Sequence, residues 1–245
     1  MIFSSLLAIF ILCLTHVFVH KLRLSGLPRS KWLSIAGGIS VSYIFLQSFP
    51  ELREIQEKIN HHEIFSIPGF REFEIYLISL LGLTFFYGLE NRTKKSSESS
   101  REPDEGGNER IVGIFRIHII SFAFYNFIIG YLLLSREDTS MAGIMIYAIA
   151  MAFHFIVTDH SMEDHFRDNY KKSGRWILVL SLFLGWVTSL LFHIPEGYVG
   201  IIFAFLAGGI IMNVLKEELP KERESNLLAF CAGVIGYSVL LIFIL

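Results

Sequence analysis

The stretch FAFLAGGIIMNVLKEELP (203–220) determines how this chain folds. No charged residue occurs in it up to Leu215, and Lys216, Glu217 and Glu218 then follow without a gap. A continuously apolar run that ends abruptly in charge predicts a helix that crosses lipid and emerges into water. A strand is excluded because the run does not alternate, and because an open sheet leaves backbone groups unsatisfied in lipid.

A second stretch, AGGISVSYIFLQSFPELRE (36–54), echoes the segment AGGIIMNVLKEELPKERE (207–224). Each opens with Ala-Gly-Gly-Ile, continues for about three turns, and closes on Pro followed by Glu and Arg, with registers that differ by one residue. Two explanations are open. The segments are copies of one repeated unit, or small residues recur in them because they let helices pack closely, as in any multi-pass protein.

Outside these two stretches, the sequence remains apolar along most of its length. It is 53% hydrophobic and only 18% charged, whereas a soluble domain has about a quarter of its residues charged. Lys21 and Arg23 follow the first apolar segment rather than precede it, which favours an uncleaved span over a signal peptide. The sequence predicts eight spans of roughly bilayer length, at 1–20, 32–49, 71–89, 111–134, 141–160, 175–194, 197–215 and 226–245.

The Lys and Arg residues set the orientation of these spans. Sixteen of the 21 lie in the loops after spans one, three, five and seven, and four lie in the alternate loops, while Arg116 falls inside span four. The positive-inside rule therefore places the first group of loops in the cytoplasm and both termini outside. With this orientation, spans two and seven run in opposite directions. The echo then predicts an inverted repeat, in which spans 1–3 and 6–8 surround spans 4 and 5.

Two segments between spans are polar. We expect residues 90–110 to form a disordered cytoplasmic loop, because NRTKKSSESSREPDEGGNER has too few apolar residues to fold. Segment 51–70 lies outside in this topology and carries His61, His62 and several Glu residues. It is either a solvated amphipathic helix or a weak surface metal site.

Several polar side chains fall within the predicted spans, where ionisable groups are costly and often functional. His118 and the Tyr125-Asn126 pair lie in span four, and His154 and Asp159 lie in span five. Asn126 and His154 fall at similar depth on neighbouring spans. Such a pair indicates either a solute pathway or an interhelical hydrogen bond worth about 0.6–2 kcal/mol.

These features together resemble the ZIP (Zrt/Irt-like) family of divalent-metal transporters. That family has eight spans, outside termini, a variable cytoplasmic loop after span three, and polar motifs on spans four and five. The resemblance is carried by FLQSFPEL (45–52), where Gln47 takes the place of a His, and by FAFLAGGIIMNVLKEELP (203–220). It implies a ZIP-like all-α bundle that forms a single transmembrane domain over residues 1–245. It also implies a multi-pass protein of a plasma or inner membrane that moves a divalent cation, Zn²⁺ by preference, towards the cytoplasm.

The metal-binding motifs are where the sequence departs from the family. The span-four motif His-Asn-x-x-Asp/Glu-Gly is matched here by residues 125–130, in which Tyr125 replaces the His and Ile129 the carboxylate. The span-five motif His-Glu-x-Pro-His-Glu is matched by residues 154–159, which keep only the first His and the final acid. The resemblance therefore implies a reduced metal site. Its ligands would be Asn126, His154 and Asp159, and the pathway would be lined by Gln47, Tyr125, Thr158 and Asn213.

Two functions follow from this mixture of match and mismatch. The first is a ZIP-type metal transporter with a reduced site. The second is a ZIP-fold protein that has lost metal transport and serves as a pseudo-transporter, a regulatory subunit or a carrier of another solute. A membrane zinc hydrolase is disfavoured because His118, His154 and His193 fall at different depths. We therefore expect no enzyme activity and no required cofactor.

The end of span five carries a separate group of polar residues. His160, Glu163 and Asp164 have the spacing that places side chains on one helical face, and His165 follows. The group is either a cytoplasmic exit site for a metal ion or the solvated end of a helix. The expected partners are membrane lipid, a divalent metal ion and a second copy of the chain as a homodimer. No nucleic acid is expected, since the net charge is −2 without a basic aromatic stretch.

Overall fold

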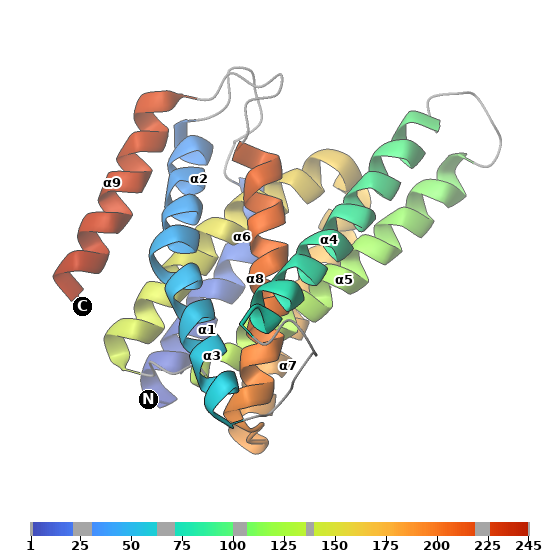
Figure 1. The fold of residues 1–245 in the computed structure, drawn as a ribbon. Coiled ribbons are helices and arrows are strands. Elements are labelled where there is room, and N and C mark those ends of the chain that lie inside the picture. Colours follow the sequence, from blue (N-terminus) through green and yellow to red (C-terminus); the bar gives the residue numbers. More distant parts are fainter. Residues whose placement is uncertain are drawn as a thin grey trace.

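The computed structural model describes residues 2–21, 31–62, 72–99, 107–135, 140–218 and 226–244. Nearly all of these residues are helical (Figure 1). The α-helices are α1 (Ile2–Phe18), α2 (Lys31–Tyr43), α3 (Phe49–His62), α4 (Glu74–Ser99), α5 (Gly107–Ser135), α6 (Met141–Asn169), α7 (Arg175–Leu191), α8 (Glu196–Glu218) and α9 (Leu227–Ile244). A short 3₁₀ turn, Val19–Lys21, extends α1, and single π-helical turns at Ile44–Ser48 and Tyr170–Gly174 join α2 to α3 and α6 to α7.

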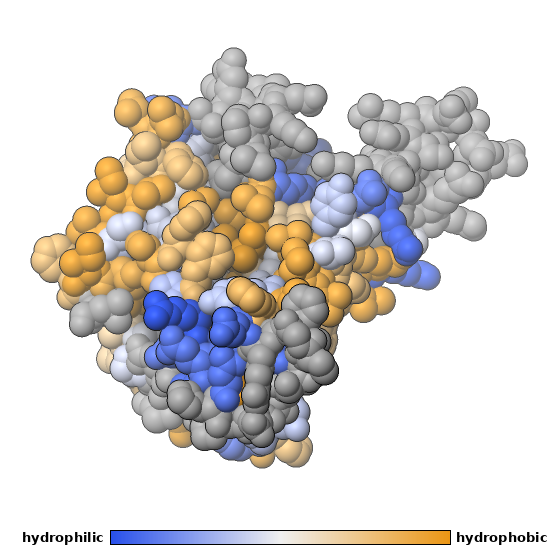
Figure 2. Space-filling model, in the orientation of Figure 1, coloured by the Kyte–Doolittle hydropathy of each residue, from blue (hydrophilic) through white to orange (hydrophobic). Residues whose placement is uncertain are grey.

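Within the described residues, five helical stretches are long and apolar enough to cross a membrane, which indicates a helical, multi-pass membrane protein. They are Lys31–Asn60, Phe115–Ser135, Met141–Asp164, Phe166–Leu191 and Gly197–Lys216. Helices Ile2–Phe18 and Leu227–Phe243 are apolar but shorter. Figure 2 shows hydrophobic residues over much of the face formed by α9, α2 and α8, as expected of a surface in contact with lipid.

The predicted disordered loop over 90–110 is wrong at both of its ends, which are helical. Helix α4 continues to Ser99 and α5 begins at Gly107, so the part outside the described residues is 100–106. A polar segment cannot form a packed core, but Glu, Lys and Arg are good helix formers and can extend an existing helix into water. The predicted amphipathic helix after span two is present as α3, while the side chains of His61 and His62 lie outside the described residues.

Helices α2 and α9 pack through a pair of glycines that face each other. A Cβ added at Gly38 would collide with the carbonyl oxygen of Phe230, and one added at Gly233 would collide with that of Ile35. Glycine therefore permits the two backbones to approach to a distance that any side chain would prevent. The start of α9 is tied to α2 as well, because the Asn226 backbone N–H donates to Ser34 Oγ over 3.2 Å.

Helices α4 and α8 repeat this contact. A Cβ at Gly208 would collide with the carbonyl oxygen of Ser79, and one at Gly82 with that of Phe205. In each pair the glycine of one helix meets the residue three positions before the glycine of the other. Figure 1 shows that α2 and α9 run in one direction and that α4 and α8 run in the opposite direction.

The two glycine contacts align the echo found in the sequence. Ile35 and Gly38 of α2 correspond to Phe205 and Gly208 of α8, 170 residues later in both cases. The same shift of 170 pairs Pro50 with Pro220 in the sequence. Matching the letters Ala-Gly-Gly-Ile gives a shift of 171, so the equivalent glycines are the second of one motif and the first of the other.

The remaining helices surround α6. Helix α5 packs along α7, where Gly130 and Gly185 form a third facing pair, and α1 packs against α6 and α7. Ser140 caps α6, with its hydroxyl oxygen accepting from the Gly143 N–H over 3.0 Å. Helix α6 thus runs through the centre of the bundle, between α1 and α5 on one side and α2 on the other.

Candidate functional site: a buried histidine between three helices

His16 of α1 lies where α1, α5 and α6 meet, and it is 1% exposed. Its Nδ1 lies 2.7 Å from Asp159 Oδ2, and its Nε2 lies 2.8 Å from Asn126 Oδ1. Asp159 and Asn126 are each 1% exposed. One imidazole therefore joins two of the predicted metal ligands, and it does so with both of its nitrogens.

The amide of Asn126 is held by its own helix. Its Nδ2 donates to the Phe122 carbonyl oxygen over 2.8 Å, which leaves Oδ1 pointing at the histidine. Since Oδ1 can only accept, His16 Nε2 carries a hydrogen and donates it. The ring also stacks obliquely on Phe155, with centroids 4.3 Å apart.

The contact between His16 and Asp159 contains one proton. Without a proton, Nδ1 and the carboxylate oxygen would both be acceptors and would repel each other at 2.7 Å. With it, either an imidazolium faces a carboxylate or a neutral histidine accepts from a carboxylic acid. Both forms are neutral overall, so the pair can be buried among apolar helices without an uncompensated charge.

The three predicted metal ligands do not converge on one point. The imidazole of His16 lies between Asn126 Oδ1 and Asp159 Oδ2, which contact opposite nitrogens of the ring. A cation bound by both oxygens would have to occupy the volume that the ring fills. Within the described part of the chain, no three His, Cys, Asp or Glu side chains gather as a group able to hold a metal ion. In this arrangement the residues do not fit a transported metal.

His154, the third predicted ligand, belongs to a neighbouring contact. Its Nε2 lies 2.8 Å from the Tyr125 hydroxyl, and it is 2% exposed. In the motif match of 125–130, Tyr125 takes the position of a histidine. Its hydroxyl, on α5, contacts His154 of α6 directly. The prediction that Asn126 and His154 form a pair is therefore replaced by two separate contacts, one to His16 and one to Tyr125.

Two predicted pathway residues share a narrow crevice between α2, α6 and α8. Thr158 and Asn213 line it together with Ser40 and His154, and it has no room for a water molecule. The hydroxyls of Ser40 and Thr158 donate to carbonyl oxygens of their own helices. The Nδ2 atom of Asn213 is buried without a hydrogen-bond partner among the described residues. Gln47 lies elsewhere and accepts from the Tyr237 hydroxyl of α9 over 3.0 Å.

The other positions of the span-four motif serve packing. Ile129, at the position of the family's carboxylate, is fully buried in the main apolar core. Gly130 faces the backbone of α7, where a Cβ would collide with the Leu182 carbonyl oxygen. The glycine kept from the motif is thus explained by helix contact alone.

The predicted exit group is divided between two ion pairs. His160 Nε2 lies 3.7 Å from Asp164 Oδ2, whereas Glu163 binds Lys171 Nζ over 2.9 Å. The side chain of His165 lies outside the described residues. Glu163 is therefore paired with Lys171 of the π-helical turn that follows α6. His160 and Asp164 lie on one face of α6, as the sequence spacing predicted.

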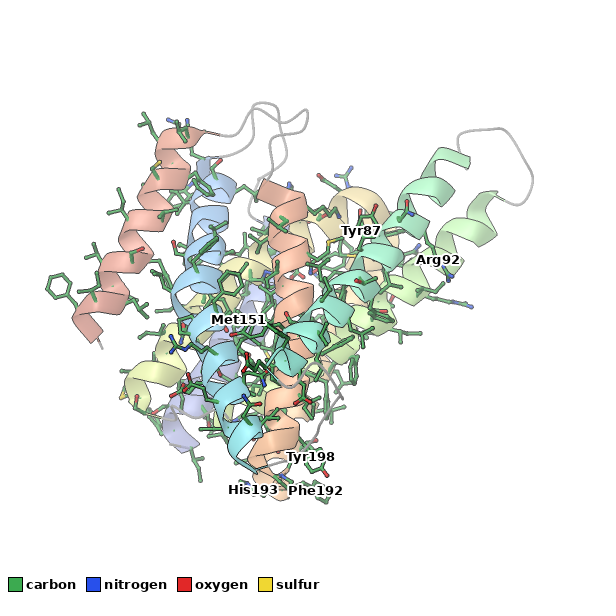
Figure 3. The ribbon with its side chains drawn as sticks, viewed as in Figure 1. Tyr87, Arg92, Met151, Phe192, His193 and Tyr198 are labelled. Atoms are coloured by element: carbon green, nitrogen blue, oxygen red, sulfur yellow. The ribbon has the colours of Figure 1, made fainter. Side chains whose placement is uncertain are left out.

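The histidines weighed for a hydrolase remain apart. Figure 3 shows His193 beside Phe192 and Tyr198 at the lower end of the bundle, far from Met151 in its middle. His118 packs against Phe122 and Phe166.

Sequence reasoning missed His16. It treated span one as uniformly apolar, although a histidine within a span is an ionisable group that needs a partner. That signal was available, but the identity of the partners was not, because Asn126 and Asp159 lie 110 and 143 residues away. A second missed contact joins the same helix to α7, where Trp186 Nε1 donates to Ser5 Oγ over 3.1 Å.

Comparison with protein-family models, curated proteins and solved structures finds no match for this chain.

Proposed function

We propose that the chain is a ZIP-like membrane protein of eight spans, with both termini outside and an inverted repeat that relates spans 1–3 to spans 6–8. Support comes from the equivalent glycine contacts of α2 with α9 and of α8 with α4, in helix pairs that run in opposite directions. The basic loops of the sequence support the orientation. Helix α4, which is apolar in its first half and polar towards Ser99, supplies the third span.

Its function, in this proposal, is that of a ZIP-fold protein that has lost divalent-metal transport. The observation that carries this proposal is the position of the His16 ring between Asn126 Oδ1 and Asp159 Oδ2. A transported divalent cation needs several converging N or O ligands with anionic charge. Here the one carboxylate among the predicted ligands is already neutralised by histidine. The protein would then act as a pseudo-transporter, a regulatory subunit or a carrier of another solute.

Divalent-metal transport is the second candidate, and one observation favours it. His16, Asn126 and Asp159 are metal-ligand types brought together from three different helices. If α1 withdrew, His16 could turn and leave space for a cation between the remaining groups. Loss of the shared proton would accompany binding, as for metal sites generally.

Flux measurements on reconstituted vesicles separate the two candidates. The purified chain, His16→Gln and His154→Ala would each be tested with Zn²⁺, Fe²⁺, Mn²⁺ and Cd²⁺ against empty vesicles, with folding checked by circular dichroism. If the protein has lost metal transport, the flux of each metal should equal the flux measured with empty vesicles. Flux by the natural sequence that falls in His16→Gln would overturn it and establish the second candidate.

A measurement in cells adds an independent check. Under lost transport, His154→Ala leaves cellular metal content unchanged, because no metal passes through the Tyr125–His154 contact. A fall in zinc, iron or manganese content caused by this substitution would contradict the proposal.

A further inference from the structure

An open groove lies where α3 leaves the π-helical turn and passes the start of α4. Its volume is about 610 Å³, within the range of ligand sites. It is lined by Phe45, Phe49, Pro50, Arg53, Glu54, Glu57 and Tyr76. None of these residues contributes to the histidine site.

The groove lies at the level where the chain leaves the apolar layer. Helix continues without a break from Lys31 to His62, which spans about 48 Å at 1.5 Å per residue and exceeds the ~30 Å hydrocarbon layer. Its apolar part ends at Phe49, and charged residues begin at Glu51. In Figure 2 a hydrophilic patch lies over α3, below the hydrophobic residues of α2. One end of the groove therefore faces lipid chains and the other faces headgroups.

The polar end carries charges of both signs. Arg53 Nε donates to Glu57 Oε1 over 3.0 Å, and these side chains are 76% and 60% exposed. A guanidinium has four further N–H donors, and the carboxylate has a second oxygen. Glu54 lines the same end, so carboxylates lie beside the guanidinium in this part of the wall.

The apolar end is aromatic. Phe45 and Phe49 meet edge to face with centroids 5.3 Å apart, and both are exposed. Tyr76 of α4 forms the opposite wall and is 41% exposed. Aromatic side chains at a membrane interface contact acyl carbons, and their ring faces also attract ammonium groups.

We propose that this groove binds the head region of a zwitterionic phospholipid with a primary ammonium group, as in phosphatidylethanolamine. Arg53 receives the phosphate, Glu57 receives the ammonium, and Phe45, Phe49 and Tyr76 contact the first acyl carbons. An N–H-bearing ammonium suits carboxylates better than a choline group, which has no N–H to donate. The Glu57 carboxylate has no cation to bind in a lipid whose headgroup is only negative, which disfavours such lipids.

Competition among headgroups tests this proposal. The full chain, purified in detergent, is mixed with equal amounts of phosphatidylethanolamine, phosphatidylcholine and phosphatidylglycerol with identical acyl chains. Bound lipid is then counted by native mass spectrometry. We expect phosphatidylethanolamine to be retained about tenfold over either of the others, as one or two charge-assisted hydrogen bonds would give. The variants Glu57→Gln and Arg53→Gln should each remove most of that preference.

The matched controls are Arg167→Gln and Asp168→Asn, exposed charges of α6 outside the groove. They should leave the preference intact, and thermal unfolding should show that all four variants fold. Equal retention of the three headgroups, or preference for phosphatidylglycerol, would overturn the proposal. So would an ethanolamine preference that Glu57→Gln leaves unchanged. None of these outcomes depends on whether the chain transports a metal.

Discussion

Two kinds of helix contact hold this bundle, and they occupy different regions. Where α2 meets α9 and α4 meets α8, facing glycines let the two backbones touch. Where α1 meets α5 and α6, a histidine, a carboxylate and an amide form hydrogen bonds instead. The first kind depends on the absence of side-chain atoms, and the second on their chemistry.

This difference follows from the lipid environment. Lipid supplies no hydrophobic force between helices, so association depends on close packing or on polar pairs. The glycine contacts are repeated at equivalent positions, as expected of structural elements. The histidine contact joins three helices through side chains 110 and 143 residues apart in the sequence.

The largest effect is expected from breaking the polar region. His16→Leu leaves Asp159 and Asn126 buried without their partner and should lower the free energy of unfolding by about 3–5 kcal/mol. The double variant His16→Leu/Asp159→Leu should recover much of that loss, because no unpaired carboxylate remains. Denaturant titration in detergent measures both. Equal losses in the single and the double variant would show that the pair is not the reason for the effect.

A smaller loss is expected in the glycine region. Gly208→Ala places a Cβ against the Ser79 carbonyl oxygen, so α4 and α8 must separate, with an expected loss of about 1–3 kcal/mol. Gly236→Ala is the matched control, since its Cβ would meet nothing within 4 Å. It should be neutral or stabilise by up to about 1 kcal/mol, the difference in helix propensity. Equal losses in the two variants would contradict the close approach of α4 and α8.

A further polar contact is the hydrogen bond between Tyr125 of α5 and His154 of α6. Tyr125→Phe removes one hydrogen bond and keeps the ring, so the expected loss is about 0.6–2 kcal/mol. The same substitution at Tyr198, an exposed residue near His193, should change nothing measurable. If Tyr125→Phe lowered the free energy of unfolding by more than about 3 kcal/mol, this hydrogen bond would be energetically coupled to the His16 contacts and not independent of them.

The sequence predicted the helices well and the site only in part. Apolar runs located the five long apolar helices found among the described residues, because lipid demands continuous apolar helix. The echo of 36–54 in 207–224 pointed to helices with equivalent glycine contacts. The helix end at Ser99 was missed because a helix can continue into water once a span has started it. Motif matching found Asn126, His154 and Asp159, but it could not reveal His16, whose role depends on contacts across more than 100 residues.

The smallest effect is expected at Asn213. Its amide nitrogen donates no hydrogen bond among the described residues, so Asn213→Leu should leave the free energy of unfolding unchanged or raise it by up to about 1–2 kcal/mol. A thermal unfolding series with Ser40→Ala as comparison checks this. A clear loss of stability would indicate that the crevice between α2, α6 and α8 holds a partner for this amide.

In this structure a histidine, His16, bridges Asn126 and Asp159 in place of the metal ion that the sequence motifs predicted. A crystal structure of the protein soaked with Zn²⁺, with anomalous diffraction measured at the zinc edge, tests it most directly. We expect no zinc peak at this position and both ring nitrogens within about 3 Å of the two oxygens. A zinc peak about 2.0–2.2 Å from His16 or Asp159, with the ring turned away, would contradict it.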